Sequence, residues 1–468
     1  MNRLVGIEEI ASVAGVRSCS RLIHLFGRQD PIYASPLPLA ACAASLLGLI
    51  GAAIDDITAS RLDEPQDISI DRVHALLTLS SLWLLKVDGK PAMQRHRPVQ
   101  IAGDGIYRCR DGRLAHLMNA FPHLTESTLR TLDCTADTID KAVAGLDSKE
   151  LETILNEASL PGVVIRDQED WRVTPQGALL NSAPAVTVTR VGDGAPASLP
   201  SSPDPLTGVR VLDATRVLAG PTCGRTLAAF GADVLHVGSP AAVDLIAAQA
   251  DTGHGKRRAL LDLQTAEGTD AMWRLIEGAD VFSQSYRANS LAARGFSVQE
   301  VARRRPGIVY VTETAYGNFG PWQSKRGFDS NVQAATGMLL LHQDHKRPQP
   351  AASLPIAMND YCTGYWGAYG VLEALRRRAS EGGSWHVEVS LAQTAMWLMR
   401  LGTIDASKAE SPEALIALAG DYTEKIDSAY GKLERLKFPI RFSRTTPRWN
   451  APVLPGTHMP AWDARTAV

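Results

Sequence analysis

The stretch GVRVLDATRVLAGPTCGRTLAAFGADVLHV, residues 208–237, decides the fold class of this chain. It places two short apolar runs, 209–214 and 233–238, around a helical segment, 222–232. Strands that alternate with helices predict an α/β domain on a doubly wound, mostly parallel, Rossmann-like sheet. Ligands bind such sheets beyond the carboxyl ends of the strands. The alternation continues, with further strands predicted at 258–263, 279–285 and 307–313 and a helix at 265–279.

A segment dense in proline, glycine, serine and aspartate, 192–208, predicts a solvated linker before this region. We therefore expect residues 1–200 to form one part, 201–207 to end the linker, and 208–468 to form the Rossmann-like domain. Residues 45–85 and 367–399 share the order helix, turn, short strand, apolar helix. This echo predicts that 1–200 is a partial, degenerate copy of the second part, although any αβα unit gives a similar pattern.

A second module is predicted between the echo and the linker. Residues 103–134 begin as a hairpin that turns at Asp111–Gly112, continue as helices, and are followed by a strand within 161–171. Together these segments predict a small α+β domain beside the larger sheet.

Composition excludes several classes of function. With 48 basic and 50 acidic residues, the chain offers no overall charge for nucleic acid or an anionic membrane. Six cysteines without CxxC pairs indicate free thiols, and the N-terminal residues hold no secretory signal, so a cytoplasmic location is expected. The apolar stretch 37–54 predicts a buried helix in preference to a membrane span.

Five ordered blocks carry a resemblance to a known family. They are 208–237, GKRRALLDLQTAEG (255–268), ADVFSQSYRANSLAARGF (279–296), VTETAYGNFGPWQSKRGFDSNVQAATGML (311–339) and AMNDYCTGYWGAYGVLEALRRR (357–378). In this order the blocks resemble the family III CoA-transferases over residues 207–400. Residues 35–200 resemble a later portion of the same family. Family members form interlocked dimers, so the resemblance implies a homodimer, although the order of segments departs from that pattern.

Asp360 is the candidate catalytic residue. It precedes an apolar helical run with Gly364, Gly367 and Gly370, although each glycine costs a helix about 1 kcal/mol relative to alanine. From the stretch alone, an N-cap aspartate and a glycine packing stripe are the favoured interpretation. The resemblance reverses this preference: it implies that Asp360 attacks an acyl-CoA thioester, and that the bared helix face admits a thioester or another backbone.

The resemblance also implies the residues that contact CoA, which would be a substrate and not a tightly bound cofactor. The loop after the first strand supplies Arg216, Val217, Leu218 and Ala219. A basic cluster suited to phosphate is formed by Lys256, Arg257 and Arg258. An alternative of equal weight is that these residues are solvent-exposed at the start of a strand. Tyr286 and Arg287 would flank the adenine or pyrophosphate, and Tyr316 and Gly317 belong to a turn near the reacting centre.

The predicted activity is therefore transfer of CoA from an acyl-CoA to a carboxylic acid through an aspartyl intermediate. A non-catalytic acyl-CoA-binding homologue and an acyl-CoA isomerase or racemase are the alternatives. Phe328 stands where the racemase branch of the family has a histidine, which argues against racemisation. Scattered histidines predict no metal site, and Cys362 has no basic neighbour in sequence to make it a nucleophile.

Overall fold

The computed structural model describes residues 6–16, 23–62, 65–95, 103–199, 202, 204–241, 244–287, 290–342 and 356–463. The described residues form four sheets, the largest with seven strands in the order β11-β10-β9-β12-β13-β14-β8. Its strands are β8 (Val186–Gly192), β9 (Arg210–Ala214), β10 (Asp233–Gly238), β11 (Lys256–Leu260), β12 (Val281–Gln284), β13 (Val309–Thr314) and β14 (Ser384–Ser390).

This strand order confirms the predicted α/β fold class. Every pairing from β11 to β14 is parallel, and only β8 joins antiparallel, at the edge beside β14. The chain moves outward from β9 through β10 to β11, then returns to β12 on the other side of β9. The reversal leaves a crevice at the carboxyl ends of β9 and β12, where doubly wound sheets bind ligands.

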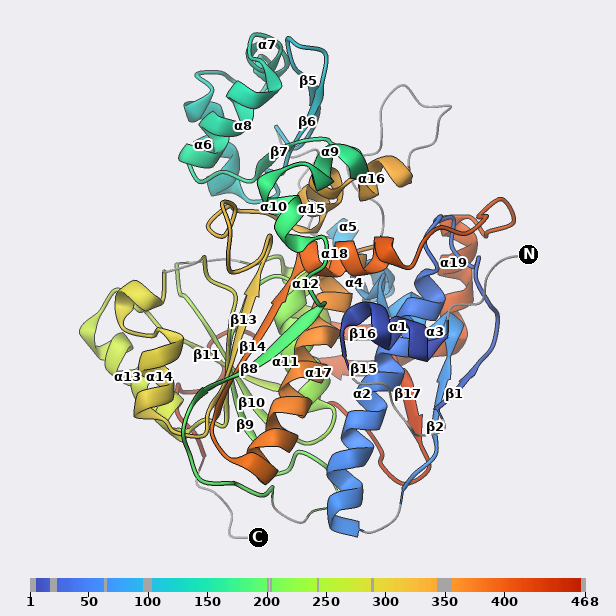
Figure 1. The fold of residues 1–468 in the computed structure, drawn as a ribbon, viewed down its shortest axis with the longest axis vertical. Helices are drawn as coiled ribbons and strands as arrows, with labels where there is room; N and C mark the ends of the chain where they lie inside the picture. Colours follow the sequence, from blue (N-terminus) through green and yellow to red (C-terminus); the bar gives the residue numbers. More distant parts are fainter. Residues whose placement is uncertain are drawn as a thin grey trace.

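Helices cover both faces of the large sheet (Figure 1), and alternate strand residues belong to different cores. Val211 belongs to the core that also contains residues of α11 and α17, whereas Leu212 belongs to the core under α13 and α14. Successive side chains point to opposite faces of a strand, so both faces of a buried parallel strand must be apolar. The covering helices are α11 (Ala219–Ala228), α13 (Ala266–Gly278), α14 (Val298–Arg304) and α17 (Met358–Glu381).

The predicted echo has a structural counterpart. In the second half, α17, β14 and α18 (Leu391–Arg400) follow one another as helix, strand, helix. In the first half, α2 (Leu39–Leu62), β2 (Ile68–Asp71) and α3 (Arg72–Thr78) repeat that order. The long helices α2 and α17 pack against each other.

Strands from both ends of the chain share sheets. One sheet has the order β1 (Ile23–Phe26), β2, β17 (Ile440–Phe442). Another joins β15 (Thr423–Ser428) and β16 (Gly431–Leu436) to β3 (Lys86–Val87) and β4 (Lys90–Pro91). In Figure 1 the blue N-terminal and red C-terminal segments accordingly lie together. Pairing thus crosses the predicted linker, and the domain boundaries stay a prediction.

The small α+β module stands above the carboxyl end of the large sheet (Figure 1). Its hairpin of β5 (Gly105–Arg108) and β6 (Leu114–Leu117) is present, and β7 (Gly162–Val164) adds to β6. Its helices are α6 (Pro122–Thr131), α7 (Ile139–Ala144), α8 (Ser148–Glu157), α9 (Gln168–Arg172) and α10 (Pro175–Leu180).

The apolar helix expected at 37–54 lies in the core. Within α2, Leu39–Ala59 is long and apolar enough to cross a membrane, with a mean hydropathy of 1.6, but 89% of its apolar window is buried in the fold. The free-thiol prediction holds for Cys42, Cys109, Cys134, Cys223 and Cys362, whereas Cys19 lies outside the described residues.

The remaining described elements complete the two halves. They are α1 (Ile7–Ala14), α4 (Ser81–Leu84), α5 (Ala92–Arg95), α12 (Ile246–Thr252), η1 (Ala292–Arg294), α15 (Asp329–Thr336), α16 (Met338–Leu341), α19 (Pro412–Leu418) and η2 (Ala419–Tyr422).

Candidate active site

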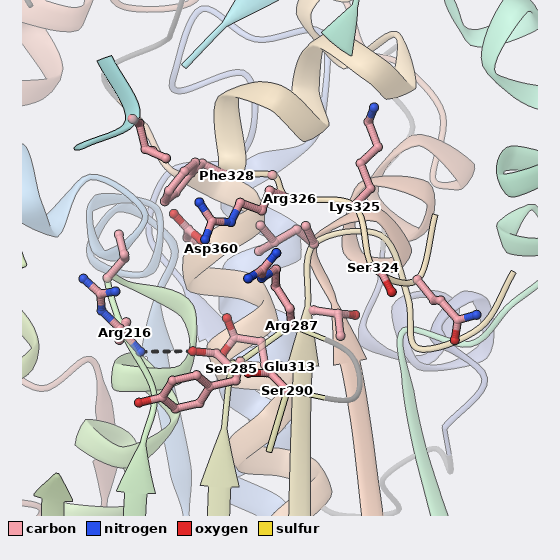
Figure 2. A pocket seen from close by; sticks show the side chains of 18 of the residues that line it. Arg216, Ser285, Arg287, Ser290, Glu313, Ser324, Lys325, Arg326, Phe328 and Asp360 are labelled. Carbon is pink, nitrogen blue, oxygen red and sulfur yellow. Dashed lines mark hydrogen bonds between the residues drawn. The ribbon is translucent and has the colours of Figure 1, made fainter. Parts of the chain in front are cut away.

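A cleft of about 340 Å³ opens at the carboxyl ends of β9, β12 and β13, beside the switch point of the sheet (Figure 2). Its walls come from the loops that follow these strands, the first turn of α17, and the small module. The lining residues are Phe121, His123, Leu124, Arg216, Val217, Ser285, Tyr286, Arg287, Ser290, Glu313, Thr314, Ala315, Gln323, Ser324, Lys325, Arg326, Gly327, Phe328, Asp360 and Leu391.

Asp360 lies on the wall of this cleft, as the third residue of α17. The N-cap residue of the helix is Ala357. Asp360 therefore does not have the N-cap role that the stretch alone predicts. Among the described residues, none donates a hydrogen bond to its carboxyl oxygens. The side chain is thus placed by its helix and left open toward the cleft.

The first turn of α17 is anchored by Asp329, the first residue of α15. Its Oδ2 accepts a hydrogen bond from the main-chain N–H of Asp360 at 3.0 Å. Its Oδ1 accepts from the side-chain amides of Asn359, at 3.2 Å, and Gln333. Asp329 is 7% exposed, so these bonds replace water around a buried carboxylate and fix the backbone of Asp360.

Three carboxyl groups at this end of the sheet have raised pKa values. Burial, then the charges of Asp329 and Glu313, raise the pKa of Asp360 well above its usual value. Burial raises the pKa of Asp329 to about 6. Burial, then the charge of Asp213, raise the pKa of Glu313 to about 8. Neighbouring carboxylates disfavour one another's ionisation, so protons are held within this cluster near neutral pH.

Three guanidinium groups also reach the cleft, from Arg216, Arg287 and Arg326 (Figure 2). Arg216 pairs with Asp244, with 2.7 Å between Nη2 and Oδ1. No carboxylate in the described part of the chain pairs with Arg287 or Arg326. Burial and the charges of Arg287 and Arg216 lower the pKa of Arg326. These two cations are available to bind a phosphate or a carboxylate.

The loop after β9 has an unusual backbone at Val217, whose φ is 68°. A β-branched residue rarely adopts a left-handed conformation, so surrounding contacts must hold it. The N–H and hydroxyl of Thr215 donate to Oδ1 of Asp213 at 3.0 and 2.5 Å, and the N–H of Arg216 donates to Ser285 Oγ at 3.1 Å. Arg216 and Val217 therefore line the cleft from a loop that these hydrogen bonds hold in place.

Lys256, Arg257 and Arg258 do not come together as a phosphate cluster at the cleft. They lie within β11 instead of leading into it, so their side chains alternate between the two faces of the sheet. Buried Lys256 donates to Asp213 Oδ2 and to the carbonyl of Pro221, both at 2.7 Å. Lys256 thereby connects β9, through Asp213, to the first turn of α11, through Pro221.

The other two members of that basic run have separate partners. Arg257 pairs with Asp233, with 3.0 Å between Nε and Oδ1, and its guanidinium lies over the ring of Trp462. Arg258 is buried and donates to the Tyr430 hydroxyl at 2.7 Å. Both side chains serve packing of the C-terminal segment on β11.

Leu218 and Ala219 are buried at the start of α11 and do not line the cleft. For Ala219, the reason is that α17 packs closely against it along the stripe formed by Gly364, Gly367 and Gly370. A Cβ on Gly364 would stand 2.3 Å from the carbonyl oxygen of Ala219, and one on Gly370 would stand 2.5 Å from Val387. The glycines admit a neighbouring helix and strand, as the packing interpretation expects, and the stripe does not face the cleft.

Tyr316 and Gly317 also lie behind the cleft wall. Tyr316 is 1% exposed, and its ring meets Trp322 edge-on with 5.0 Å between centroids. Gln176 of α10 donates to the carbonyl of Tyr316 at 2.8 Å. A Cβ on Gly327 would stand 2.7 Å from the Tyr316 ring, so this ring supports the lining segment 323–328 from below.

The small module supplies part of the cleft wall through Phe121, His123 and Leu124. The rings of Phe121 and Phe328 stack, with 5.6 Å between centroids. This contact closes one side with aromatic surface, across more than 200 positions of sequence. The first half of the chain therefore contributes to the candidate active site.

The first copy of the helix has no carboxylate at the equivalent position. The third residue of α2 is Ala41, and its N–H donates to Oδ2 of Asp30 at 2.8 Å. Asp30 thus holds α2 as Asp329 holds α17, but the residue held is an alanine. The first copy of the helix therefore lacks a carboxyl side chain where the second copy has its candidate nucleophile.

Sequence reasoning missed Glu313, Arg326 and His123 as lining residues, and Asp329 as the anchor of Asp360. Glu313 and Arg326 both lie within the quoted block 311–339. Glu313 could have been predicted, because a charged residue at the carboxyl end of a predicted parallel strand indicates a place in the ligand site. His123 gave no comparable indication, because its position follows from the docking of the small module.

No group of three histidine, cysteine, aspartate or glutamate side chains in the described ranges is placed to hold a metal ion. The chemistry available to the cleft is that of its carboxyl, guanidinium, ammonium, hydroxyl and imidazole groups. Such a combination suits an anionic ligand and attack by a carboxylate.

A family model described as CoA-transferase family III matches residues 206–414. Residues 206–414 belong to CoA-transferase family III. This family III segment contains Asp360, Asp329, Glu313 and the three arginines of the cleft. Phe121, His123 and Leu124 lie outside it.

Curated relatives have matching names. The chain is 30% identical over 73% of its length to the acetyl-coenzyme A transferase nodX of Hypoxylon pulicicidum, and spans 65% of that protein. It is 27% identical over 93% of its length to an acyl-CoA transferase of Gibberella moniliformis, and spans 90% of it. A succinate–glutarate CoA-transferase of Agrobacterium fabrum is 31% identical over 41% of this chain and 52% of its own length.

Solved structures with some likeness include a hypothetical protein, Rv3272, from Mycobacterium tuberculosis. It is 28% identical, with a TM-score of 0.39 over 49% of this chain and 64% of that chain. A CAIB/BAIF family protein from Brucella suis is 23% identical, with the same TM-score of 0.39.

Proposed function

We propose that this protein transfers CoA from an acyl-CoA thioester to a carboxylic acid, with Asp360 as the covalent nucleophile. One observation carries the proposal: the Asp360 carboxyl group faces the cleft at the switch point of a family III segment, with its backbone anchored and its oxygens unpartnered among the described residues.

Asp360 would act by attacking the carbonyl carbon of the thioester. The C–S bond breaks and leaves a mixed anhydride, and the released CoA sulfur then attacks the aspartyl carbonyl to give an aspartyl-CoA thioester and free acid. A second carboxylic acid reverses these steps and leaves as the new acyl-CoA. A carboxylate is a weak nucleophile, so catalysis depends on positioning and on burial that raises its basicity.

The cations of the cleft support CoA as the ligand. CoA carries a pyrophosphate and a 3′-phosphate, and Arg287 and Arg326 have no carboxylate partner among the described residues. The loop with Arg216 and Val217 follows β9 and lines the same cleft as these cations and Asp360 (Figure 2). We therefore place the phosphates toward the arginines and the thioester toward Asp360.

The small module supports transfer in preference to hydrolysis. A mixed anhydride is destroyed by water, so its site must be covered. Phe121 and Phe328 stack on one side of the cleft, and Leu124 adds apolar surface. Phe121 and Leu124 would provide a cover that the predicted catalytic domain, 208–468, does not supply by itself.

Trapping the intermediate tests the proposal. Incubation with acetyl-CoA or succinyl-CoA and hydroxylamine should place a hydroxamate on Asp360, detected by peptide mass spectrometry. Asp360→Asn should form none, whereas Asp270→Asn, which changes an exposed aspartate of α13, should behave as wild type. Binding of both thioesters without any adduct or transfer would favour the non-catalytic alternative.

An isomerase or racemase is the second alternative. Phe328 cannot move a proton, but the imidazole of His123 does reach the cleft. Transfer chemistry requires no exchange at the α-carbon, so incubation of propionyl-CoA in D₂O should incorporate no deuterium. Incorporation that disappears in His123→Ala would establish the alternative. A homodimer stays a prediction, to be tested by light scattering.

A further inference from the structure

Glu313 is the feature of the cleft that this mechanism leaves unused. It lies in β13 next to the carboxyl end and reaches the same cleft as Asp360 (Figure 2). No described residue forms an ion pair or hydrogen bond with its side chain. A carboxyl group that is half-buried and unpartnered in a structural role would be costly, which points to a role with the ligand.

The position of its oxygen is informative. A Cβ built on Gly220 would stand 2.5 Å from Glu313 Oε2 and 2.3 Å from Thr215 Cβ. Glu313 Oε2 is therefore close to both residues. The carboxyl group therefore lies beside Thr215, in the loop after β9, and beside the first turn of α11. This is the loop that the resemblance assigns to contact with CoA. Asp360 enters the cleft from α17.

We propose that Glu313 is a second catalytic residue, a carboxylic acid that gives its proton to the departing CoA sulfur and takes it back when that sulfur attacks. The inference rests on the proposed function. Asp360 reaches the cleft from α17, and Glu313 reaches it from β13, beside the loop after β9. The thioester bond would therefore lie between the two carboxyl groups.

The proton and electrons balance in each step. As an Asp360 oxygen bonds to the acyl carbon, the C–S bond breaks and the sulfur leaves with the electron pair. The sulfur accepts the proton of Glu313, which becomes a carboxylate. When the CoA thiol attacks the aspartyl carbonyl, this carboxylate removes the thiol proton and returns to its acid form. No net proton is consumed in a full transfer.

The surroundings of Glu313 favour its acid form. Burial and the charge of Asp213 raise its pKa to about 8, so it carries a proton at neutral pH. When Glu313 is uncharged, Asp329 is the remaining negative neighbour that raises the pKa of Asp360, so Asp360 ionises more readily. The titratable or charged groups around it are Asp213, Arg216, Cys223, Lys256, Tyr286, Arg287, Arg326, Asp329 and Asp360.

The test compares Asp360 acylation in wild type, Glu313→Gln and Glu313→Asp by rapid quench and peptide mass spectrometry, using acetyl-CoA and succinyl-CoA. Glu313→Gln has the same shape but no transferable proton, so acylation at pH 7 should fall about 100-fold. The wild-type rate should fall as pH rises through about 8, where Glu313 loses its proton, and Glu313→Gln should lack this decline. Glu313→Asp should be slower than wild type but keep the decline.

The outcomes separate the two proposals. Glu267→Gln, an exposed glutamate of α13, is the matched control and should change nothing. A Glu313→Gln rate within twofold of wild type, with the same pH profile, would overturn the role of Glu313 while Asp360 acylation stands. If Glu313→Gln does not fold, a Glu313→Asp profile without the alkaline decline would overturn it. If neither thioester acylates Asp360 in the wild-type protein, the proposed function itself is refuted.

Discussion

Asp329 Oδ2 accepts the main-chain N–H of Asp360 at 3.0 Å, so one buried carboxylate holds the backbone of the candidate nucleophile. The same relationship recurs in the first half, where Asp30 accepts the N–H groups of Ala40 and Ala41 at 3.2 and 2.8 Å. The anchor is present in both copies, but only the second anchors a carboxyl side chain. This comparison predicts one active site per chain.

Replacing the anchor should separate stability from activity. Asp329→Ala leaves N–H groups of α17 and the Asn359 amide without their acceptor, which should lower the free energy of unfolding by about 1–3 kcal/mol. Because Asp360 loses its fixed position, CoA transfer should also fall at least tenfold. Asp30→Ala is the matched control: calorimetry should show a comparable stability loss, with transfer by the folded protein unchanged. Equal transfer rates in the two variants would contradict the anchoring role.

Stability should depend on pH through the carboxyl cluster. The folded-state pKa values of Asp360 and Glu313 are raised, so the proton is bound more tightly in the folded protein. Their contribution to stability is present below the unfolded pKa, near 4, and is lost as pH rises through the folded value. Asp360→Asn should therefore flatten the fall in Tm between pH 5 and 8, measured by calorimetry. Asp270→Asn should leave the wild-type slope, and an equal slope in both variants would refute this prediction.

The arginines should recognise phosphate. Arg326→Ala removes a cation that has no carboxylate partner among the described residues, so CoA should bind about tenfold more weakly by calorimetric titration. The loss should shrink as salt concentration rises. Arg304→Ala provides the control, because Arg304 pairs with Glu277 on the surface of α14. Unchanged CoA affinity in Arg326→Ala would remove this residue from the site.

The glycine stripe should tolerate alanine at one position and not at another. A Cβ on Gly364 would stand 2.3 Å from Ala219 O, which forces α17 away from α11, so Gly364→Ala should lower Tm and transfer activity. At Gly367 the nearest atom, Cys223 Sγ, is 3.4 Å away. Gly367→Ala should fold normally and gain up to about 1 kcal/mol from helix propensity. Similar thermal unfolding of the two variants would contradict close packing of these helices.

Local pattern predicted the elements of the large sheet well. The strand expected at 233–238 is β10, and those expected at 209–214 and 307–313 are β9 and β13 with shifted ends. The strand expected at 258–263 begins earlier, at Lys256. This shift matters, because a basic run inside a strand points to two faces and cannot act as one cluster.

The site was predicted in part. Asp360, Arg216, Val217, Tyr286 and Arg287 line one cleft, as residues at the ends of parallel strands and at a helix start should. Tyr316 and Ala219 are covered instead, because α10 and α17 pack over them. A resemblance marks a loop, but packing decides which of its side chains point toward the ligand.

The sequence by itself determined the α/β fold, since alternating apolar strands and helices can bury both faces only in a layered parallel sheet. It also marked Asp360 as the residue of interest. Only the tertiary structure decided which groups surround that carboxyl: Glu313, Asp329, Arg326, and Phe121 from the other half. Their proximity, charge and exposure come from segments far apart in the chain, so no local pattern encodes them.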